Sequence, residues 1–340
     1  GVPVYQLLGG RFREKVRLYA DTHIEEGRAT GILMEPEKVG RILKGYMDQG
    51  FTVVKILSVE LLMAQEGNTC GPLDWVDELR AVEEKVRQVT RTGTRAESSA
   101  ANALLYDFNR IPHPFTNMHV TEQGLDQLDE YIGRVRSVIG TKVPLAIDHF
   151  GHFPLPDMIK IARRLEKYHL AWLEDMLPWY LTDQYRELKH ATTAPIATGE
   201  DMYLAESFEP LLQAGALDVV HPDLLTSGGI LETKKLGDLA ARYGASMALH
   251  MCESPVSALA GAHMATASEN FFAQEHDAFD SEWWQDLIIG PVKPIVKDGF
   301  TVITDAPGLG IEGLNEDLIR EHGPMKGKDV WVSTDEWNQE

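Results

Sequence analysis

The chain contains three similar stretches, each an apolar, strand-like run that reaches an acidic residue: VPLAID (residues 143–148), AWLED (171–175) and PIATGE (195–200). Their carboxylates, Asp148, Glu174 and Glu200, are spaced 26 residues apart in both intervals. An interval of this length accommodates one strand, one helix and two loops, which is the repeat of a β/α barrel. The spacing therefore predicts successive parallel strands whose acidic ends meet at one mouth.

The rest of the chain continues this alternation. Five further segments read as strands: VRLYADTH (16–23), TVVKIL (52–57), DVVHPDL (218–224), SMALHM (246–251) and FFAQEH (271–276). Amphipathic helix patterns lie between strands: MIKIARRLEKY (158–168), TDQYRELKHA (182–191), LAESFEPLLQAG (204–215) and LETKKLGDLAARYG (231–244). Eight strands alternating with helices predict an α/β fold, a closed (β/α)8 TIM-type barrel.

Domain boundaries follow from the same pattern. We expect residues 1–15 to be the end of a helix and a linker, and residues 16–280 to form the catalytic barrel. An interval of about 58–142 is too long for a single crossover and is interpreted as an insertion, either an active-site flap or a surface excursion. Residues 281–340, rich in Trp, Pro and Gly, are predicted to be a C-terminal segment that folds back on a neighbouring domain.

Composition narrows the class of protein. The net charge is −20, from 32 basic and 52 acidic residues, which argues against nucleic acid or an anionic membrane as a partner. No run approaches the roughly 18–20 apolar residues of a membrane-spanning helix, and no signal peptide is recognised. Two cysteines suit a reducing compartment, so we expect a cytoplasmic protein.

The three carboxylates predict a metal site. Charges held this close repel, and their pKa values would rise unless a cation neutralised them. Oxygen ligands favour a hard divalent cation, with Mg²⁺ as the first choice and Mn²⁺ as the second. The alternative for any single strand-end Asp is a turn or helix-capping role.

Polar side chains occur at the ends of the other predicted strands as well: His23, Lys55, Asp223, His250 and Glu275 are among them. Each residue alone has a structural alternative, such as a surface ion pair for Lys55. Catalytic groups of barrel enzymes come from several strand ends, and a purely structural barrel has no need for such a ring. The complete set therefore favours an active site.

These motifs resemble the mandelate racemase subgroup of the enolase superfamily, from PVYQLLGG (3–10) to DAPGLGIE (305–312). The resemblance implies Asp148, Glu174 and Glu200 as metal ligands, an Asp–His dyad formed by Asp223 (HPDLLTSGG) and His250 (ALHMCESP), and a strand-eight acid, Glu275. It also implies an N-terminal α+β capping domain, here missing or truncated, and a homo-oligomer, either a dimer or an octamer.

Members of this subgroup remove a proton next to a carboxylate. That proton is weakly acidic, so the resulting ene-diolate needs electrostatic stabilisation by the metal. A neutral imidazole is a suitable base, and a carboxylate bonded to its other nitrogen fixes the tautomer. We therefore expect His250 to be the base, Asp223 to orient it, and Glu275, if it is protonated or hydrogen-bonded, to contact the substrate carboxylate.

One position departs from the family pattern. Racemases of the subgroup carry K-x-K on strand two, whereas this chain has Lys55-Ile56-Leu57. Without a second lysine base, the chemistry expected is dehydration of a sugar acid (an aldonate or aldarate) to a 2-keto-3-deoxy acid. The donor of the proton to the leaving hydroxyl is His250, Lys55, or a histidine near strand three, His149 or His152. His149 and His23 are candidate substrate-binding residues, although His23 fits a structural role equally well.

Two alternatives remain open from the sequence. An isomerase of the same family, a cycloisomerase or an epimerase that uses Lys55 as the second base, would share the metal site and the small carboxylate substrate. A catalytically idle barrel would keep the metal site for binding alone. The Asp223–His250 pair argues against the idle barrel.

Overall fold

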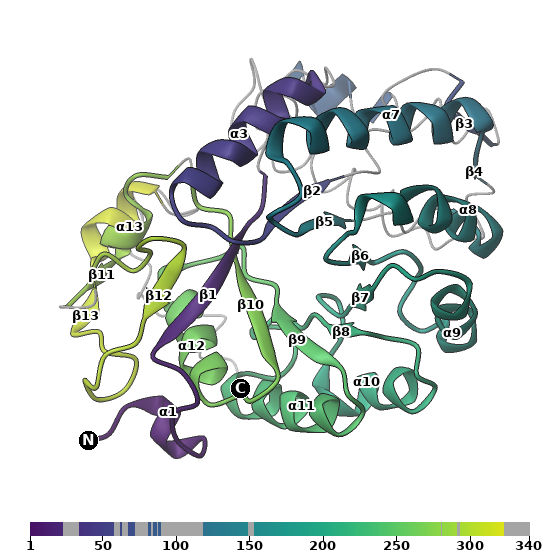
Figure 1. Ribbon diagram of the computed structural model, residues 1–340. Helices are drawn as coiled ribbons and strands as arrows, with labels where there is room; N and C mark the ends of the chain where they lie inside the picture. The colour runs from purple at the N-terminus through teal and green to yellow at the C-terminus, as the bar shows by residue number, and fades with distance from the viewer. Residues whose placement is uncertain are drawn as a thin grey trace, which may run out of the picture.

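Eight parallel strands close into a barrel in this computed structural model, which describes residues 1–22, 34–57, 62, 67–71, 81–82, 84–86, 88–89, 118–148, 153–279, 281–290 and 293–322. The strands are β1 (Lys15–Ala20), β2 (Val54–Leu57), β5 (Leu145–Asp148), β6 (Leu173–Glu174), β7 (Ile196–Thr198), β8 (Val219–Val220), β9 (Ser246–Leu249) and β10 (Phe271–His276). Each pairs in parallel with the next, and β10 pairs with β1 to close the ring (Figure 1). The predicted (β/α)8 barrel is thereby confirmed.

Helices surround this ring. They are α3 (Pro36–Asp48), α7 (Glu122–Ile139), α8 (Leu155–Leu165, extended by the 3-10 turn η1, Glu166–Tyr168), α9 (Thr182–Ala191), α10 (Leu204–Gln213), α11 (Ile230–Arg242) and α12 (Pro255–Thr266). In α8, Met158, Ile161 and Leu165 recur at helical spacing and are buried, because one face packs on the sheet. Gly215 follows α10 with φ of 62°, the left-handed conformation that ends a helix.

The long interval between β2 and β5 contains one well-described helix. Helix α7 lies beside α3 on the outside of the barrel, as Figure 1 shows. Its first turn is capped by Thr121, whose side chain accepts a hydrogen bond from the Gly124 amide. Strands β3 (Thr69–Cys70) and β4 (His119–Val120) form a small antiparallel pair just before α7.

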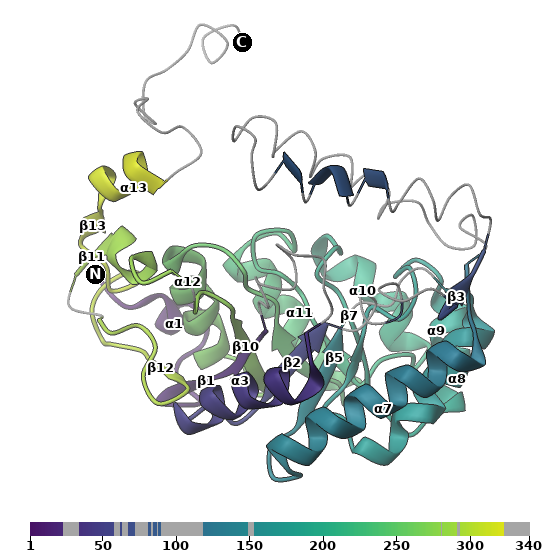
Figure 2. The same cartoon turned by 90° about the horizontal axis from the view of Figure 1, so that it is seen from above.

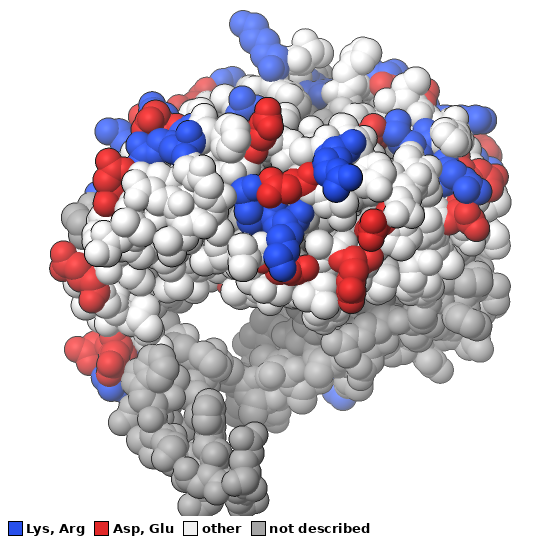
Figure 3. All heavy atoms as spheres, turned by 90° about the horizontal axis from the view of Figure 1, so that it is seen from below, with Lys and Arg blue, Asp and Glu red and all other residues white. Residues whose placement is uncertain are grey.

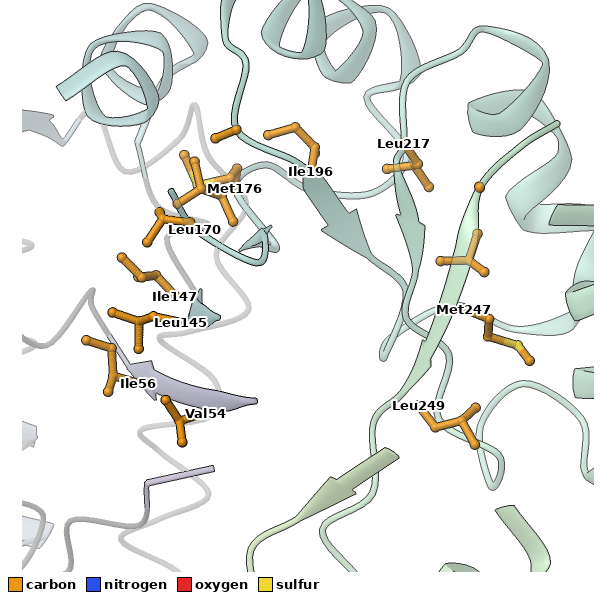
Figure 4. Close-up of a cluster of buried hydrophobic side chains, with 14 of the residues drawn as sticks. Val54, Ile56, Leu145, Ile147, Leu170, Met176, Ile196, Leu217, Met247 and Leu249 are labelled. Atoms are coloured by element: carbon orange, nitrogen blue, oxygen red, sulfur yellow. The ribbon is translucent and has the colours of Figure 1, made fainter. Parts of the chain in front are cut away.

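Two layers of buried side chains hold the barrel together. The larger layer fills the space between strands and helices, and Figure 4 shows side chains such as Ile56, Ile147 and Met247 on the outer side of the strands. The inner layer is built from small residues and two aromatic rings, Tyr19 and Trp172, which meet edge to face with centroids 5.3 Å apart. These rings fill a lumen that alanines alone would leave open.

Helix α12 is buried on all sides because the terminal segments cover its outer face. Helix α1 (Val4–Leu7) packs against it, and the Tyr5 ring stacks on His263. The 3-10 turn η2 (Trp284–Leu287) also contacts α12. Strands β11 (Ile288–Ile289) and β13 (Gly313–Leu314) and helix α13 (Glu316–His322) lie on the same side of the barrel (Figure 2), while β12 (Phe300–Val302) pairs antiparallel with β1.

Two tryptophans of the C-terminal segment, Trp283 and Trp284, pack within the chain. Trp284 is buried and its indole N–H donates to the carbonyl of Glu253, 2.8 Å away. Trp283 stacks on His322 of α13, with ring centroids 4.1 Å apart. On the face shown in Figure 3, basic and acidic side chains are interspersed over the described surface. In the described part of the chain, no helix combines the length and apolarity needed to span a bilayer.

Candidate active site

Acidic side chains gather at the carboxyl ends of β5, β6 and β7. Two groups of ligand atoms, each with all atoms within 4.8 Å of one another, are found here among the described residues: Asp148, Glu174 and Asp175, and Glu174, Glu200 and His221. Glu174 belongs to both groups, so the structure brings the three carboxylates predicted from the sequence into one cluster. All but one of the candidate ligand atoms are carboxylate oxygens, the donor type that suits a hard divalent cation.

Asp175 was not predicted from the sequence. Successive side chains of an extended strand point to opposite faces, so Glu174 and Asp175 were not expected to act together. The backbone at Asp175 adopts φ of 45°, which breaks the alternation and leaves both carboxylates in one cluster. Thr198 donates a hydrogen bond to Asp175 Oδ1 at 2.5 Å and fixes it there.

The pKa values of the cluster report its crowding. Burial and the charge of Asp148 raise the pKa of Glu174 to about 8. Burial and the charge of Asp175 raise the pKa of Glu200 well above its usual range. A divalent cation among these oxygens would offset both causes, since its positive charge favours the ionised form of each carboxylate. The cluster therefore fits such an ion by donor type and by charge.

Lys55 lies among three carboxylates. Its Nζ is 2.9 Å from Asp148 Oδ2, 3.2 Å from Glu174 Oε1 and 2.8 Å from Glu275 Oε1. Burial disfavours the ammonium charge, but the attraction of these carboxylates outweighs it and holds the pKa of Lys55 well above its usual value. The residue is therefore a fixed positive charge and a poor proton acceptor.

Side chains of the inner layer of the barrel contact the carboxylate of Glu174. The Trp172 indole N–H donates to its Oε2 at 2.5 Å. His221 Nδ1 lies 3.1 Å from its Oε1 without hydrogen-bond geometry, while His221 Nε2 shares a hydrogen bond of 2.7 Å with the Tyr19 hydroxyl. Burial and the charge of Lys55 lower the pKa of His221 to about 3, so this imidazole is neutral. These aromatic residues support Glu174 in place.

His250 and Asp223 form a hydrogen-bonded dyad. The backbones of the two residues pair as an isolated parallel bridge beyond β8 and β9, and His250 Nδ1 lies 2.7 Å from Asp223 Oδ2. The amide of Leu225 donates to the other carboxylate oxygen of Asp223 at 2.6 Å, which fixes the orientation of that group. The other ring nitrogen of His250, Nε2, lies 3.5 Å from Glu200 Oε2, so the dyad is directed at the acidic cluster.

Charges around the dyad favour the imidazolium. Burial opposes it, but the charge of Glu275 and the hydrogen bond to Asp223 hold the pKa of His250 well above its usual value. Burial likewise favours protonated Glu275, yet the charges of Lys55 and His250 hold its pKa below the usual range. Glu275 is thus an ionised link between Lys55 and the dyad, and it also accepts a hydrogen bond from the Met251 amide.

Three histidines that the sequence suggested for the site, His23, His149 and His152, lie outside the described residues. His276, at the end of β10, points into an aromatic environment of Phe51, Phe279 and Trp284. It is a buried residue whose ring packs against these aromatic side chains.

Comparisons with known proteins agree with the barrel fold. Residues 113–318 match the family described as "Enolase C-terminal domain-like". A solved structure of a mandelate racemase/muconate lactonizing enzyme-like protein from Rubrobacter xylanophilus is 30% identical, with a TM-score of 0.73 over 95% of this chain and 72% of that one. A mandelate racemase/muconate lactonizing enzyme from Sulfitobacter is 25% identical, with a TM-score of 0.70 over 94% and 67%.

The chain belongs to the enolase superfamily, and within it to the mandelate racemase-like proteins, as the sequence resemblance predicted. Among curated relatives, D-xylonate dehydratase of Haloferax volcanii is 28% identical over 94% of this chain. D-gluconate/D-galactonate dehydratase of Picrophilus torridus is 24% identical, also over 94%. The chain spans 65% and 66% of the lengths of these two relatives.

Proposed function

We propose that this barrel belongs to a hydro-lyase that depends on a divalent cation and dehydrates a sugar acid, an aldonate or aldarate, to a 2-keto-3-deoxy acid. The observation that carries the proposal is the dyad: His250 Nδ1 is held by Asp223 while Nε2 faces Glu200, 3.5 Å away. A base held in this way next to a cation site is suited to removing a proton beside a carboxylate. The dehydratase names of the relatives support the same reaction class.

Asp148, Glu174 and Glu200 would hold the cation, with Mg²⁺ favoured by their oxygen donors. When bound, the cation supplies positive charge that stabilises the carboxylate of the substrate as its α-carbon loses a proton. Neutralising the charge of Glu200 would also return His250 towards the neutral form that a general base requires. Lys55 contacts Asp148 and Glu174 and so adds a fixed positive charge to the cluster.

The dyad carries the proton in this proposal. Neutral His250 takes the α-proton from C2 of the sugar acid, and Asp223 stabilises the imidazolium that forms. The electrons of the broken C–H bond form the C2–C3 double bond as the C3–O bond breaks. His250 returns its proton to the departing hydroxyl, which leaves as water, and the enol product tautomerises to the 2-keto acid.

The alternative proton donors and functions are less well supported. Lys55 is surrounded by three carboxylates that raise its pKa, so it is a poor acid for the leaving group and a poor second base for an epimerase. His149 and His152 lie outside the described residues. His250 is the proposed acid as well as the base, because it carries the abstracted proton next to the departing hydroxyl.

A screen of sugar acids tests the proposal. The protein is incubated with Mg²⁺ and with D-xylonate, D-gluconate, D-galactonate and a set of aldarates, and 2-keto acid formation is measured. We expect turnover of at least one acid sugar, loss of turnover with excess chelator, and loss in His250→Asn. Reactions in D₂O separate the classes, since deuterium at C2 of recovered substrate without keto acid would favour an isomerase. Turnover that survives exhaustive chelation would reject the metal-dependent mechanism.

A further inference from the structure

The loop after β9 carries three side chains of types that can ligate a metal, within four residues. Ligand atoms of His250, Cys252 and Glu253 all lie within 4.8 Å of one another. The group differs from the acidic cluster because each residue offers a different donor: an imidazole nitrogen, a thiol sulfur and a carboxylate oxygen. Cys252 is exposed and Glu253 is half-buried, so an ion can approach from solvent.

The loop is fixed by contacts on both sides. The amide of His250 donates to the Pro222 carbonyl at 3.2 Å. At its other end, the carbonyl of Glu253 accepts from the Trp284 indole N–H, and its Oε2 accepts from the Ser257 hydroxyl at 3.1 Å. The side chain of Ser254 then caps α12. Because the backbone is already held, little ordering is needed to bring the three donors to one ion.

The donor set selects a different type of cation from the acidic cluster. Thiolate, imidazole and carboxylate are the ligands of Zn²⁺, whereas Mg²⁺ prefers oxygen alone. Tetrahedral Zn²⁺ with bonds of about 2.0–2.3 Å places its ligand atoms roughly 3.5 Å apart. The exposed Cys252 side chain is the one of the three least restrained by packing. Negative charge nearby also favours a cation here, since Glu200 and Glu275 carboxylate oxygens lie 3.5 and 3.8 Å from His250 Nε2.

We propose that His250, Cys252 and Glu253 form a second metal site, selective for a thiophilic divalent cation such as Zn²⁺, whose occupation inhibits the enzyme. A cation on either ring nitrogen would displace a proton that His250 exchanges with the substrate or shares with Asp223. The proposed binding of the cation rests only on the positions of the three side chains. The inhibition rests on the proposed function, in which His250 is the base.

Binding is tested by thiol protection, with Zn²⁺ as the probe. The other cysteine, Cys70, is an internal control: it is also exposed, and it pairs across β3–β4 with His119, but it belongs to no three-ligand group among the described residues. Metal-free protein is treated with iodoacetamide, with and without Zn²⁺, and the alkylation of each cysteine is followed by mass spectrometry. Zn²⁺ should slow alkylation of Cys252 at least about tenfold and leave Cys70 nearly unchanged. Mg²⁺ should protect neither thiol.

Two variants test the ligand set. Glu253→Gln and His250→Asn should each weaken the protection of Cys252, because each removes one donor. Equal protection of both cysteines, or none of Cys252, would overturn the site. Protection that persists unchanged in both variants would mean that Zn²⁺ binds the thiol without the other two ligands, and this also rejects the site.

Inhibition is tested at saturating Mg²⁺. Cys252→Ser should raise the Zn²⁺ concentration for half-inhibition at least about tenfold, since the thiolate is the strongest of the three donors, and Cys70→Ser should leave it unchanged. If Zn²⁺ inhibits parent and Cys252→Ser alike, Zn²⁺ acts at the acidic cluster and the inhibitory role is wrong. Thiol protection in a protein that converts no sugar acid would instead reject the proposed function and retain the second metal site.

Discussion

Lys55 Nζ and Glu275 Oε1 lie 2.8 Å apart, although their strands, β2 and β10, are separated in the barrel by β1. The pair is buried together with Asp148 and Glu174, so each charge depends on the others. Removing one partner of such a set leaves uncompensated charge in a poorly solvated place.

Replacing Lys55 should therefore destabilise the fold. We expect Lys55→Met to lower the free energy of unfolding by about 3–5 kcal/mol without metal, measured by urea denaturation. Added Mg²⁺ should restore part of the loss, because it neutralises the same carboxylates. Lys235→Met is the control, since it breaks only an exposed pair with Glu232 and should change stability by less than about 1 kcal/mol. A loss in Lys55→Met that Mg²⁺ leaves untouched would contradict this explanation.

The hydroxyl of Tyr19 should influence cation affinity without touching the cation. It shares a hydrogen bond with His221, whose ring lies against Glu174. Residues that orient ligands alter metal affinity about 10–100-fold when they are replaced, so Tyr19→Phe should weaken Mn²⁺ binding by at least about tenfold in calorimetry.

Tyr131→Phe is the matched control for that experiment. Its hydroxyl donates to the Met34 carbonyl, on the outside of the barrel. Both variants should lose about 1 kcal/mol of stability, but only Tyr19→Phe should bind the ion more weakly. Equal affinities in the two variants would show that the hydroxyl of Tyr19 serves packing alone.

His250 and Asp223 should separate catalysis from metal binding. His250→Asn should lower kcat by about 10²–10⁴-fold, the range of a lost general base, and leave Mg²⁺ affinity within about twofold of the parent, because a neutral general base contributes little to holding the cation. Asp223→Asn should also lower kcat, because the imidazolium loses its partner. Kinetics and calorimetry on the same preparations check both outcomes. A large loss of Mg²⁺ affinity in His250→Asn would instead assign His250 to the primary metal site.

His276 should make the fold sensitive to acid. Burial lowers its pKa to about 4, whereas an unfolded histidine titrates near 6.5. Between these values the unfolded chain binds the proton more readily, so stability falls as the pH drops from about 6.5 to about 4, by up to roughly 3 kcal/mol. His276→Phe, which suits the aromatic surroundings, should lose that part of the pH dependence. The urea midpoint of unfolding is measured at pH 7 and at pH 5 for the parent and the variant. An equal change of midpoint in the two proteins would refute the assignment.

The sequence predicted the barrel because its strands end at recognisable polar residues. Asp148, Glu174, Asp223 and Glu275 each close or follow an apolar run, and regular spacing turns such runs into neighbouring strands. Strands β6 and β8 are only two residues long in the structure, shorter than AWLED and DVVHPDL, although backbone hydrogen bonds to the neighbouring strands continue on either side, as at Asp218 and His221.

The rest of the site depends on geometry that the sequence does not display. Asp175 joins the acidic cluster through one left-handed backbone angle. His221 lies within the predicted strand DVVHPDL, yet its contacts with Tyr19 and Glu174 arise from strands far apart in the chain. Cys252 and Glu253 lie in a loop, where no periodicity indicates the direction of a side chain.

The pairing of β10 with β1 has a consequence for the order of assembly. The chain emerges from the ribosome with its N-terminal end first. The ring closes only when β10 pairs with β1, so β10 must be synthesised before closure. The same strand delivers Glu275 to Lys55 and to His250. Until residue 276 has been synthesised, the nascent chain holds a positively charged lysine and a histidine without their shared acid. Completion of the active site and closure of the ring thus depend on the same strand, β10.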